Sequence, residues 1–385
     1  MRPAYRELRT DRTVTCPATR RDGHWHTGAP TSHHSSPPRT YYPRTNCWDV
    51  RHHTLTADLQ LPPDDALADL QQALHHLDTV PWPPQTTPTL QLTRSLRDYR
   101  NSEGMTTALA TDTWDLSLHG PTGTSLRRLT HSPAALARLA ARLAAQWQQQ
   151  HHQPPPAPAP LPDHTALVLA PAVAGVLIHE LIGHALEEGD LPPRTPVLPA
   201  HTRITAPPAA GRPADDEGVT TRALTLVDDG TTALAPTDRT TTPHDSCPAG
   251  HAWCAPHGLQ PRLRLLDLTV HNPAAPHGHG AWPAATAYCT AVRGAQYHAG
   301  QALLDISHAE LVTSGTAPLL LAPFRLAAGH RDLARAVFTT TTPALLDKPD
   351  HAPRGACIKH GDLLPSRVQC PPLLLPHPRV MRYGR

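Results

Sequence analysis

The sequence predicts an α+β protein of two domains: helices on an antiparallel sheet in the N-terminal domain, and a β-rich C-terminal domain built around one buried helix. The chain has 385 residues, and single domains usually hold about 100–200. A proline-rich run, residues 151–163, separates two parts of different pattern. Helical and alternating apolar spacings are mixed before this run, whereas alternation dominates after it.

The part before the proline-rich run divides into an irregular segment, residues 1–60, and a folded α+β domain, residues 61–150. The first segment is polar, dotted with proline and without apolar periodicity. In the domain, leucines at helical spacing after acidic residues predict a helix over residues 64–78. Alternation on both sides of the Asn-Ser-Glu-Gly run at residues 101–104 predicts a β-hairpin or a meander.

A second helix of the N-terminal domain is marked by its start, its apolar face and its end. Ser132 is a residue type that caps helices, and Pro133 suits a first turn. Apolar side chains then recur at helical spacing from Leu136 to Trp147. The run 151–163 favours an extended polyproline conformation, so it ends this helix and forms the linker.

The C-terminal domain, residues 164–385, is expected to begin with a strand, a turn and a helix over residues 164–193. Asp229 and Gly230 are typical of a two-residue hairpin turn between apolar runs. Alternation over residues 301–327 predicts further strands. The rest of this domain is therefore expected to be mainly β-structure.

Composition excludes several classes of protein. The net charge is +2, no dense Lys/Arg block occurs and Phe occurs twice, so a nucleic-acid-binding surface is not expected. The longest apolar run, residues 166–178, is shorter than the roughly 20 residues that span a bilayer. Seven cysteines, an odd number, argue against a disulfide framework, and the N-terminus lacks the apolar core of a secretory signal. A soluble protein of the reducing cytoplasm, without membrane contact, is therefore expected.

The segment VLIHELIGHALEEGD, residues 176–190, places polar side chains inside an apolar helix. Apolar residues on nearly every side indicate that the helix is buried. His179, Glu180 and His184 would then be buried too, and an unpaired buried polar group costs about 2–7 kcal/mol. A bound metal ion is one partner that would satisfy all three. The alternative is that the histidines form hydrogen bonds with the backbone of the core.

The spacing of the two histidines has a structural consequence. On a regular α-helix, residues five apart lie about 140° apart around the axis, so His179 and His184 could not reach one ion. A π-bulge accommodates one extra residue in a turn, and such bulges occur often at functional sites. The sequence therefore predicts an i→i+5 widening over residues 179–184, with Gly183 tolerating the distortion.

The same segment resembles the signature of the TldD/PmbA family of metallopeptidases, whose active members carry HExxxH followed by an acidic Gly-Asp turn. Three other segments are similar to family segments in the same order: residues 99–105 (YRNSEGM), 215–230 (DDEGVTTRALTLVDDG) and 354–375 (RGACIKHGDLLPSRVQCPPLLL). The resemblance covers residues 164–385 well and the N-terminal third loosely. Residues 260–270 keep the Pro-Arg of the family pattern but lack its Asn.

The resemblance implies roles for four residues. His179, His184 and Cys357 become ligands of Zn²⁺, and Glu180 becomes the general base. Two imidazoles and one thiolate leave a fourth position for water, as in catalytic zinc sites. For Cys357 the alternative is a small core side chain. On this resemblance, residues 164–385 form a metallopeptidase domain that hydrolyses peptides or unfolded segments, for example in leader-peptide removal or the maturation of modified peptides.

The resemblance also implies partners. Members of the family pair a metal-bearing subunit with a homologous subunit that lacks the motif, so a peptide substrate and either such a heterodimer or a homodimer are expected. Two other functions stay open: a non-catalytic peptide-binding subunit whose metal site is vestigial, and a zinc amidohydrolase acting on a non-peptide amide. An intact Glu180 argues against the vestigial site.

Two further groups of residues have the chemistry to take part in metal binding. One of the acids Glu187, Glu188 and Asp190 could hold a ligand histidine in place, although all three are equally typical of a solvated helix end. Residues 247–254 (CPAGHAWC) contain two cysteines and a histidine, but their spacing fits no common structural zinc motif. We interpret this segment as a loop with incidental cysteines.

Overall fold

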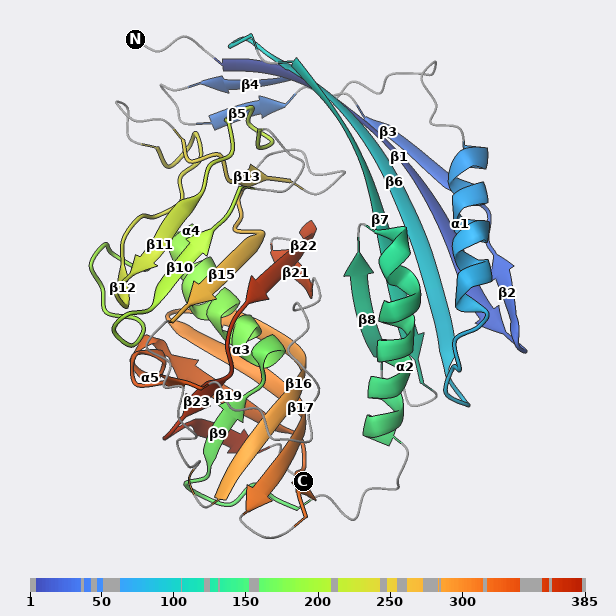
Figure 1. Cartoon of the computed structure of the whole chain (residues 1–385). Coiled ribbons are helices and arrows are strands. Elements are labelled where there is room, and N and C mark those ends of the chain that lie inside the picture. The colour runs from blue at the N-terminus through green and yellow to red at the C-terminus, as the bar shows by residue number, and fades with distance from the viewer. Residues whose placement is uncertain are drawn as a thin grey trace.

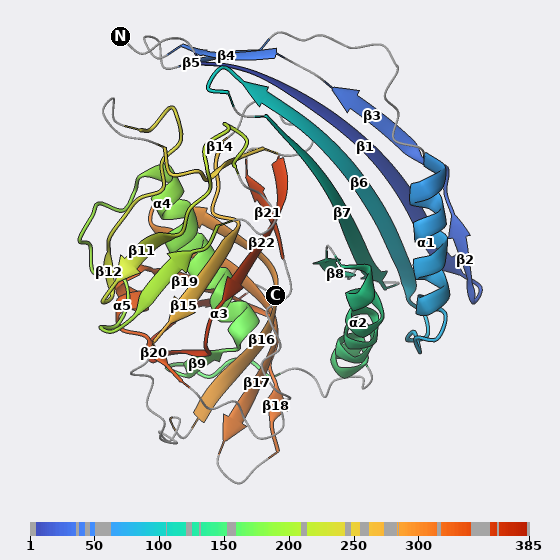
Figure 2. The same cartoon turned by 45° about the horizontal axis from the view of Figure 1, so that its top comes forward.

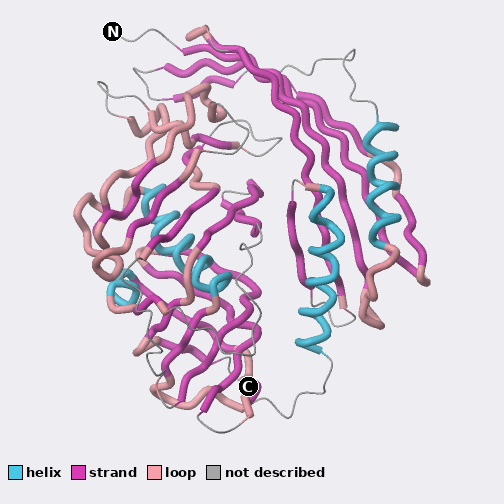
Figure 3. Tube along the Cα trace, viewed as in Figure 1, coloured by secondary structure: helices cyan, strands magenta, loops and turns pink. Residues whose placement is uncertain are grey.

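The structure, a computed structural model, consists of an N-terminal unit and a C-terminal unit. It describes residues 5–35, 38–42, 47–50, 63–104, 106–120, 125–130, 132–151, 159–208, 214–242, 248–254, 262–272, 283, 285–313, 317–339, 355–359 and 362–382. The N-terminal unit is a curved sheet with two helices, and the C-terminal unit is a β-rich body that encloses one helix (Figures 1 and 2). Strands hold more residues than helices in both units (Figure 3). The α+β class predicted from the sequence is confirmed.

The N-terminal sheet is antiparallel, with the strand order β5-β4-β1-β6-β7-β8, and β2 and β3 also pair with β1. Its strands are β1 (Tyr5–Arg21), β2 (His24–Thr27), β3 (Thr31–Ser35), β4 (Pro38–Tyr42), β5 (Cys47–Val50), β6 (Thr87–Asn101), β7 (Thr106–His119) and β8 (Ser125–Thr130). Strands β6 and β7 form the hairpin that the sequence predicts, and Gly104 in their turn has a φ of +86°. That prediction is confirmed.

The prediction of an irregular segment over residues 1–60 is wrong for the part of it that the structure describes. Strand β1 pairs with β6 over most of its length, from Glu7↔Asn101 to Thr19↔Thr89. Among the described side chains of β1, those in the apolar core of this unit are small or β-branched: Val14, Cys16 and Ala18. The apolar alternation is therefore too short and weak to mark a strand, and pairing with a segment distant in sequence decides the structure.

Two helices, α1 (Pro63–Leu77) and α2 (Leu136–His151), pack against this sheet, as the leucine spacing predicts. The core between the helices and the sheet includes Leu70, Leu77, Leu90, Leu92, Trp114, Leu116, Leu118 and Leu143. Pro133 opens a short 3-10 turn (Pro133–Ala135) before α2. Ser132 has the extended backbone of a cap residue, but its side chain makes no capping hydrogen bond.

The C-terminal unit contains two larger sheets. One has the order β12-β11-β10-β15-β22-β21, and the other has the order β20-β23-β9-β16-β17-β19-β24, with β18 pairing with β17. The first comprises β10 (Arg203–Ala206), β11 (Leu224–Asp228), β12 (Thr231–Thr232), β15 (Asp267–His271), β21 (Gly355–Lys359) and β22 (Asp362–Gln369). The second comprises β9 (Ala166–Leu169), β16 (Ala285–His298), β17 (Gln301–Thr313), β18 (Leu319–Leu320), β19 (Phe324–Gly329), β20 (Val337–Phe338), β23 (Leu373–Leu375) and β24 (Arg379–Arg382). The predicted hairpin around Asp229 and Gly230, formed by β11 and β12, is confirmed.

The buried helix of the C-terminal unit packs against both sheets. Its first part, α3 (Pro171–Ile178), follows β9 and contacts β16 of one sheet and β22 of the other. Apolar side chains of the helix and of both sheets form one core. Two short strands, β13 (Ala252–Trp253) and β14 (Arg262–Leu263), and a short helix, α5 (His330–Ala334), complete the unit. This packing fixes the helix that carries the candidate site.

The predicted linker lies mostly outside the described residues. Helix α2 ends at His151, and Ala159 forms a bridge with Leu321 of the C-terminal unit. The boundaries of the domains therefore stay a prediction. Among the helices of the described part of the chain, none is both long and apolar enough to cross a membrane.

Ion pairs join the N-terminal sheet to the C-terminal unit. Arg97 on β6 donates from Nε to Oδ1 of Asp11 on β1 (2.6 Å) and from Nη1 to Asp216 of the C-terminal unit. The other carboxylate oxygen of Asp216 accepts the backbone N–H of Cys254 at 2.8 Å. Nearby, Arg239 binds both carboxylate oxygens of Glu103, at 3.1 and 2.8 Å. We call the contacts of Arg97 and Arg239 the domain joint.

The substitution Arg97→Ala should destabilise the protein strongly. It would remove the guanidinium that binds two buried carboxylates, since the side chains of Asp11 and Asp216 are only 5% and 4% exposed. Removing one partner of a buried ion pair costs about 3–5 kcal/mol, so we expect a loss of that order in the free energy of unfolding, measured by urea denaturation.

A matched control is Arg203→Ala. Arg203 pairs with Asp228 on the surface, where the two side chains are 57% and 53% exposed. Exposed pairs contribute about 0–1 kcal/mol, so this variant should stay close to the wild type. Equal losses of unfolding free energy in the two variants would show that the domain joint stabilises the protein no more than a surface ion pair does.

Candidate metal centre

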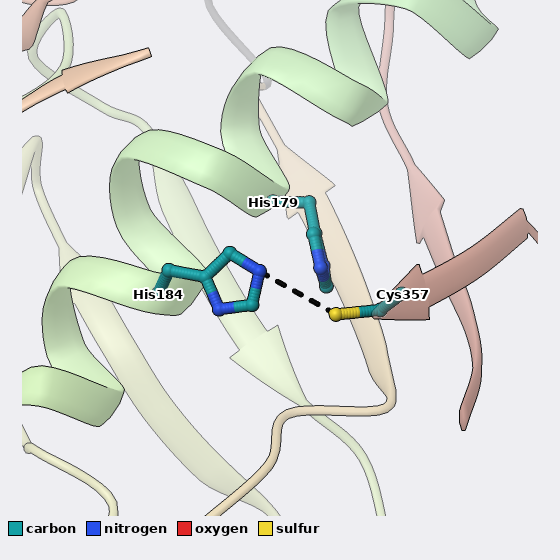
Figure 4. A group of neighbouring side chains, drawn as sticks. All are labelled: His179, His184 and Cys357. Atoms are coloured by element: carbon teal, nitrogen blue, oxygen red, sulfur yellow. Dashed lines mark hydrogen bonds between the residues drawn. The ribbon is translucent and has the colours of Figure 1, made fainter. Parts of the chain in front are cut away.

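The buried helix widens where the spacing of its histidines predicts. Helix α3 continues into a π-helical segment (His179–His184) and then into α4 (Ala185–Glu188), which ends at Gly189 with a φ of +78°. All six residues of the π segment are buried. Both imidazoles lie on the same side of the helix (Figure 4). The predicted i→i+5 widening is confirmed.

Gly183 and Gly175 of the helix differ in how much space surrounds them. A Cβ added at Gly183 would lie 3.7 Å from His179 Nδ1, which is an ordinary contact, so packing gives no reason for glycine there. At Gly175, a Cβ would come within 3.0 Å of the carbonyl oxygen of Val368 on β22. Gly175 therefore lets the helix approach the strand that pairs with β21, and β21 carries Cys357.

The structure brings His179, His184 and Cys357 together. The potential ligand atoms of the three side chains all lie within 4.8 Å of one another. The Cys357 Sγ is 3.4 Å from Nε2 of His184, and the two imidazole rings lie edge to face with centroids 4.6 Å apart (Figure 4). Cys357 is 173 residues from His184 in sequence, so the cluster depends on the packing of β21 and β22 against the helix.

The donor set fits a metal ion. His179 is 8% exposed, yet neither of its ring nitrogens has a hydrogen-bond partner in the described part of the chain. Buried polar atoms of this kind normally find a partner, and an ion among two nitrogens and one sulfur would supply it. The alternative of core histidines bonded to the backbone is not seen, because His184 bonds side chains instead.

A carboxylate fixes the orientation of His184. Nδ1 of the ring lies 2.8 Å from Oε2 of Glu187, whose other oxygen accepts the backbone N–H of Leu265 at 2.7 Å. The side chain of Glu187 is 1% exposed. An ionised carboxylate accepts hydrogen bonds only, so Nδ1 carries the proton and Nε2 faces Cys357.

The other acids near the helix have different surroundings. Glu188 is exposed, and the carboxylate of Asp190 accepts the hydroxyl of Tyr297 on β16 at 2.8 Å. Glu180 is 8% exposed, and its Oε2 is 4.0 Å from His184 Nε2. Glu187 is thus the acid that holds His184, and Glu180 lies beside the ring nitrogen that faces the cluster.

The cluster without metal favours a charged pair. For Cys357, burial raises the pKa of the thiol, but the two neighbouring imidazoles outweigh it and lower the pKa to about 6. For His184, burial lowers the pKa of the ring, but Cys357 and Glu187 outweigh it and raise the pKa to about 10. At neutral pH the pair is therefore thiolate and imidazolium.

The segment CPAGHAWC shows no zinc site in the part that the structure describes. Nε2 of His251 lies 3.0 Å from the carbonyl oxygen of Arg222, and Cys254 is buried against Asp216. Cys247 lies outside the described residues. Cys370 is also buried, and burial raises the pKa of its thiol. His179, His184 and Cys357 form the one group of metal-binding geometry found among the described residues.

Two of the segments that resemble the family, residues 99–105 and 215–230, do not belong to this cluster. Gly218 in the run Asp-Glu-Gly-Val has a φ of +71°, and Asp215 accepts the backbone N–H groups of Glu217 and Val219, both at 2.9 Å. Arg239 donates to the Glu217 carbonyl and to Glu103, which lies in the YRNSEGM segment. Two of the family-like segments therefore meet at the domain joint.

Fold and site together define a class of protein: an α+β chain of two units whose HExxxH helix brings a histidine pair to a cysteine. Solved structures with the same fold include TldE from Thermococcus kodakarensis, with a TM-score of 0.63 and 12% identity over 98% of this chain and 96% of that chain. A candidate modulator of DNA gyrase from Thermotoga maritima has a TM-score of 0.63 and 11% identity, covering 98% and 96%. A candidate modulator from Bacteroides thetaiotaomicron has a TM-score of 0.61 and 11% identity, covering 98% and 95%.

These likenesses show that the chain has the TldE fold over nearly its whole length. The fold that the TldD/PmbA resemblance implies is therefore confirmed. At the level of sequence, no family profile and no curated protein matches the chain.

Glu187→Ala should weaken metal binding while leaving all three proposed ligands in place. Without the carboxylate, the ring of His184 loses the partner that holds its orientation, and such changes cost about 10–100-fold in metal affinity. Competition with a chromophoric chelator measures the affinity. Glu188→Ala, the exposed neighbouring acid, is the matched control and should bind like the wild type. Equal metal affinities for both variants would show that Glu187 does not support metal binding.

Metal binding should depend on pH. His184 must give up its proton before Nε2 can bind an ion, because the pKa of its ring is about 10 without metal. We therefore expect release of at least about one proton per Zn²⁺ near pH 8, from His184, and an apparent affinity that rises at least about tenfold per pH unit as the pH approaches 10. Titration calorimetry in buffers of different ionisation enthalpy measures this release. Uptake without proton release would contradict the charged pair.

Proposed function

We propose that this chain is a zinc-dependent peptidase of the TldD/PmbA type. His179, His184 and Cys357 would hold Zn²⁺, and Glu180 would act as general base. The observation that supports this most is the convergence, within 4.8 Å, of one sulfur from β21 and two imidazoles from a helix that is widened over the motif. The fold shared with TldE agrees with it.

The choice of zinc rests on the donors. Thiolate and imidazole suit Zn²⁺, and three protein ligands leave one position open, as in catalytic sites. Zn²⁺, when bound, would polarise the scissile carbonyl and lower the pKa of a water molecule. The chain's own contribution is to place a carboxylate, Glu180, where it can move the proton of that water.

Two glutamates, Glu180 and Glu187, would have separate roles in the reaction. Glu180 would take a proton from the attacking water and return it to the leaving amine, so no covalent intermediate is needed. Its burial and its place beside His184 Nε2 suit this task. Glu187 would keep His184 oriented through the reaction, because its own carboxylate is held by the Leu265 N–H.

The place of Cys357 favours an extended peptide as substrate. In the described part of its sheet, β21 is the terminal strand and pairs with β22 on one side. A peptide that adds to the other edge as a strand would be held by main-chain hydrogen bonds, which tolerate many sequences. Its carbonyl groups would then pass beside Cys357. Leader-peptide removal or modified-peptide maturation, with a motif-less homologue or a second copy as partner subunit, fits this mode of binding.

Glu180→Gln should separate metal binding from catalysis. The amide has nearly the size of the carboxylate but cannot take a proton, so we expect a loss in kcat of about 10²–10⁴-fold with zinc content unchanged. His179→Ala and Cys357→Ala should lose zinc and activity together. Zinc is measured by elemental analysis, and cleavage is measured on unfolded peptides with the chain alone and with a motif-less homologue added.

Other outcomes would favour the other functions. A wild-type chain that takes up no zinc on reconstitution would point to a peptide-binding subunit with a vestigial site. A zinc-loaded chain that hydrolyses small amides but no peptides would point to an amidohydrolase. Full peptidase activity in Glu180→Gln would remove this residue from the mechanism.

A further inference from the structure

The π segment needs support from outside its own helix. A π-helix is rare, and in proteins it survives as a short wide turn inside an α-helix. Here the wide turn holds both histidines of the cluster, so any return to a regular helix would move one imidazole to another side. A contact that holds the wide turn would therefore also hold the geometry of the metal site.

One side chain from another element reaches the backbone of this turn. Nε2 of His330 lies 2.8 Å from the carbonyl oxygen of Leu181, which is midway between the two histidines of the motif. A carbonyl can only accept, so Nε2 carries the proton and donates it. A carbonyl oxygen has two lone pairs and can accept this bond in addition to one within the helix. Leu181 itself is fully buried, at 0% exposure.

His330 is itself held firmly. It is the first residue of α5, whose start is fixed by a 2.9 Å hydrogen bond from the Gly329 N–H to the Asp332 carboxylate. Leu333 of the same helix is fully buried in the core of the C-terminal unit. Strand β19, which leads into α5, pairs with β17 up to Gly329. The donor therefore stands on a rigid element rather than on a loop.

We propose that His330 is a positioning residue of the metal centre, holding the widened turn through the Leu181 carbonyl so that His179 and His184 face one ion. It acts through the backbone and touches neither the ion nor the substrate. The inference rests on the proposed metal centre and adds a residue that the HExxxH motif does not contain. Without this bond, the turn keeps its ligands but loses their relative orientation.

The test uses Co²⁺ as a spectroscopic probe in the full-length chain. The cobalt spectrum reports the coordination geometry, and titration gives the affinity. His330→Leu keeps a similar volume but has no donor, so it should alter the visible bands and weaken Co²⁺ binding by about tenfold or more. His330→Gln keeps an N–H at a similar distance from the backbone, so it should restore both the spectrum and the affinity.

A core variant of the other unit separates positioning from general instability. Leu143 is 1% exposed in the N-terminal core. Leu143→Ala should lower the melting temperature and leave the cobalt spectrum unchanged.

The inference is overturned if His330→Leu has the wild-type spectrum and affinity, if His330→Gln is as impaired as His330→Leu, or if Leu143→Ala changes the spectrum in the same way. A wild-type chain that binds no Co²⁺ would overturn the metal centre itself, and this inference with it.

Discussion

The structure depends on one constraint: two imidazoles five residues apart must face the same point. A regular α-helix separates them by about 140°, whereas a turn closed by i→i+5 hydrogen bonds brings the sixth residue back toward the side of the first. Such a wide turn is rarely stable by itself, so other parts of the chain have to pack around it. The chain meets this requirement by burying all six residues of the segment between two sheets.

The same burial shapes the chemistry of the cluster. A buried thiol alone would have a raised pKa, as Cys289 and Cys370 show. Cys357 differs because it lies against imidazoles, and His184 in turn is held by Glu187. Each charge is stabilised by a neighbour of opposite sign, so the site can be buried and charged at once. The arrangement also keeps a nitrogen and a sulfur close to one another, 3.4 Å apart.

The sequence itself predicts the part of this site that lies on the helix, whereas Cys357, which is distant in sequence, is predicted only by the family resemblance. The apolar surroundings of HELIGH and the five-residue spacing are enough to predict burial and the wide turn, because both follow from the geometry of one helix. Cys357 could be predicted from the family resemblance alone, since its approach depends on Gly175 and on the packing of β22. His330 could not be predicted, because the chain has 28 histidines and no spacing marks this one. The sequence does not predict strand β1 for a related reason: its pairing with β6 decides its structure, and its own apolar pattern is weak.

The domain joint connects the N-terminal sheet to the C-terminal unit, which carries this site. Burial raises the pKa of Asp215 and of Glu217 above the ordinary range, so placing these acids in the interior opposes folding. Two arginines bind this loop. Arg97 of the N-terminal sheet donates to Asp216, which lies between the two acids. Arg239 donates its backbone N–H to Glu217 and its side chain to Glu103 of the N-terminal unit. Ion pairs of this kind have strict geometry and favour one orientation over others more than they add net stability. In that orientation, β8 of the N-terminal sheet comes next to β21. The joint thereby sets how the two units meet beside the strand that carries Cys357, where an added peptide strand would have to enter.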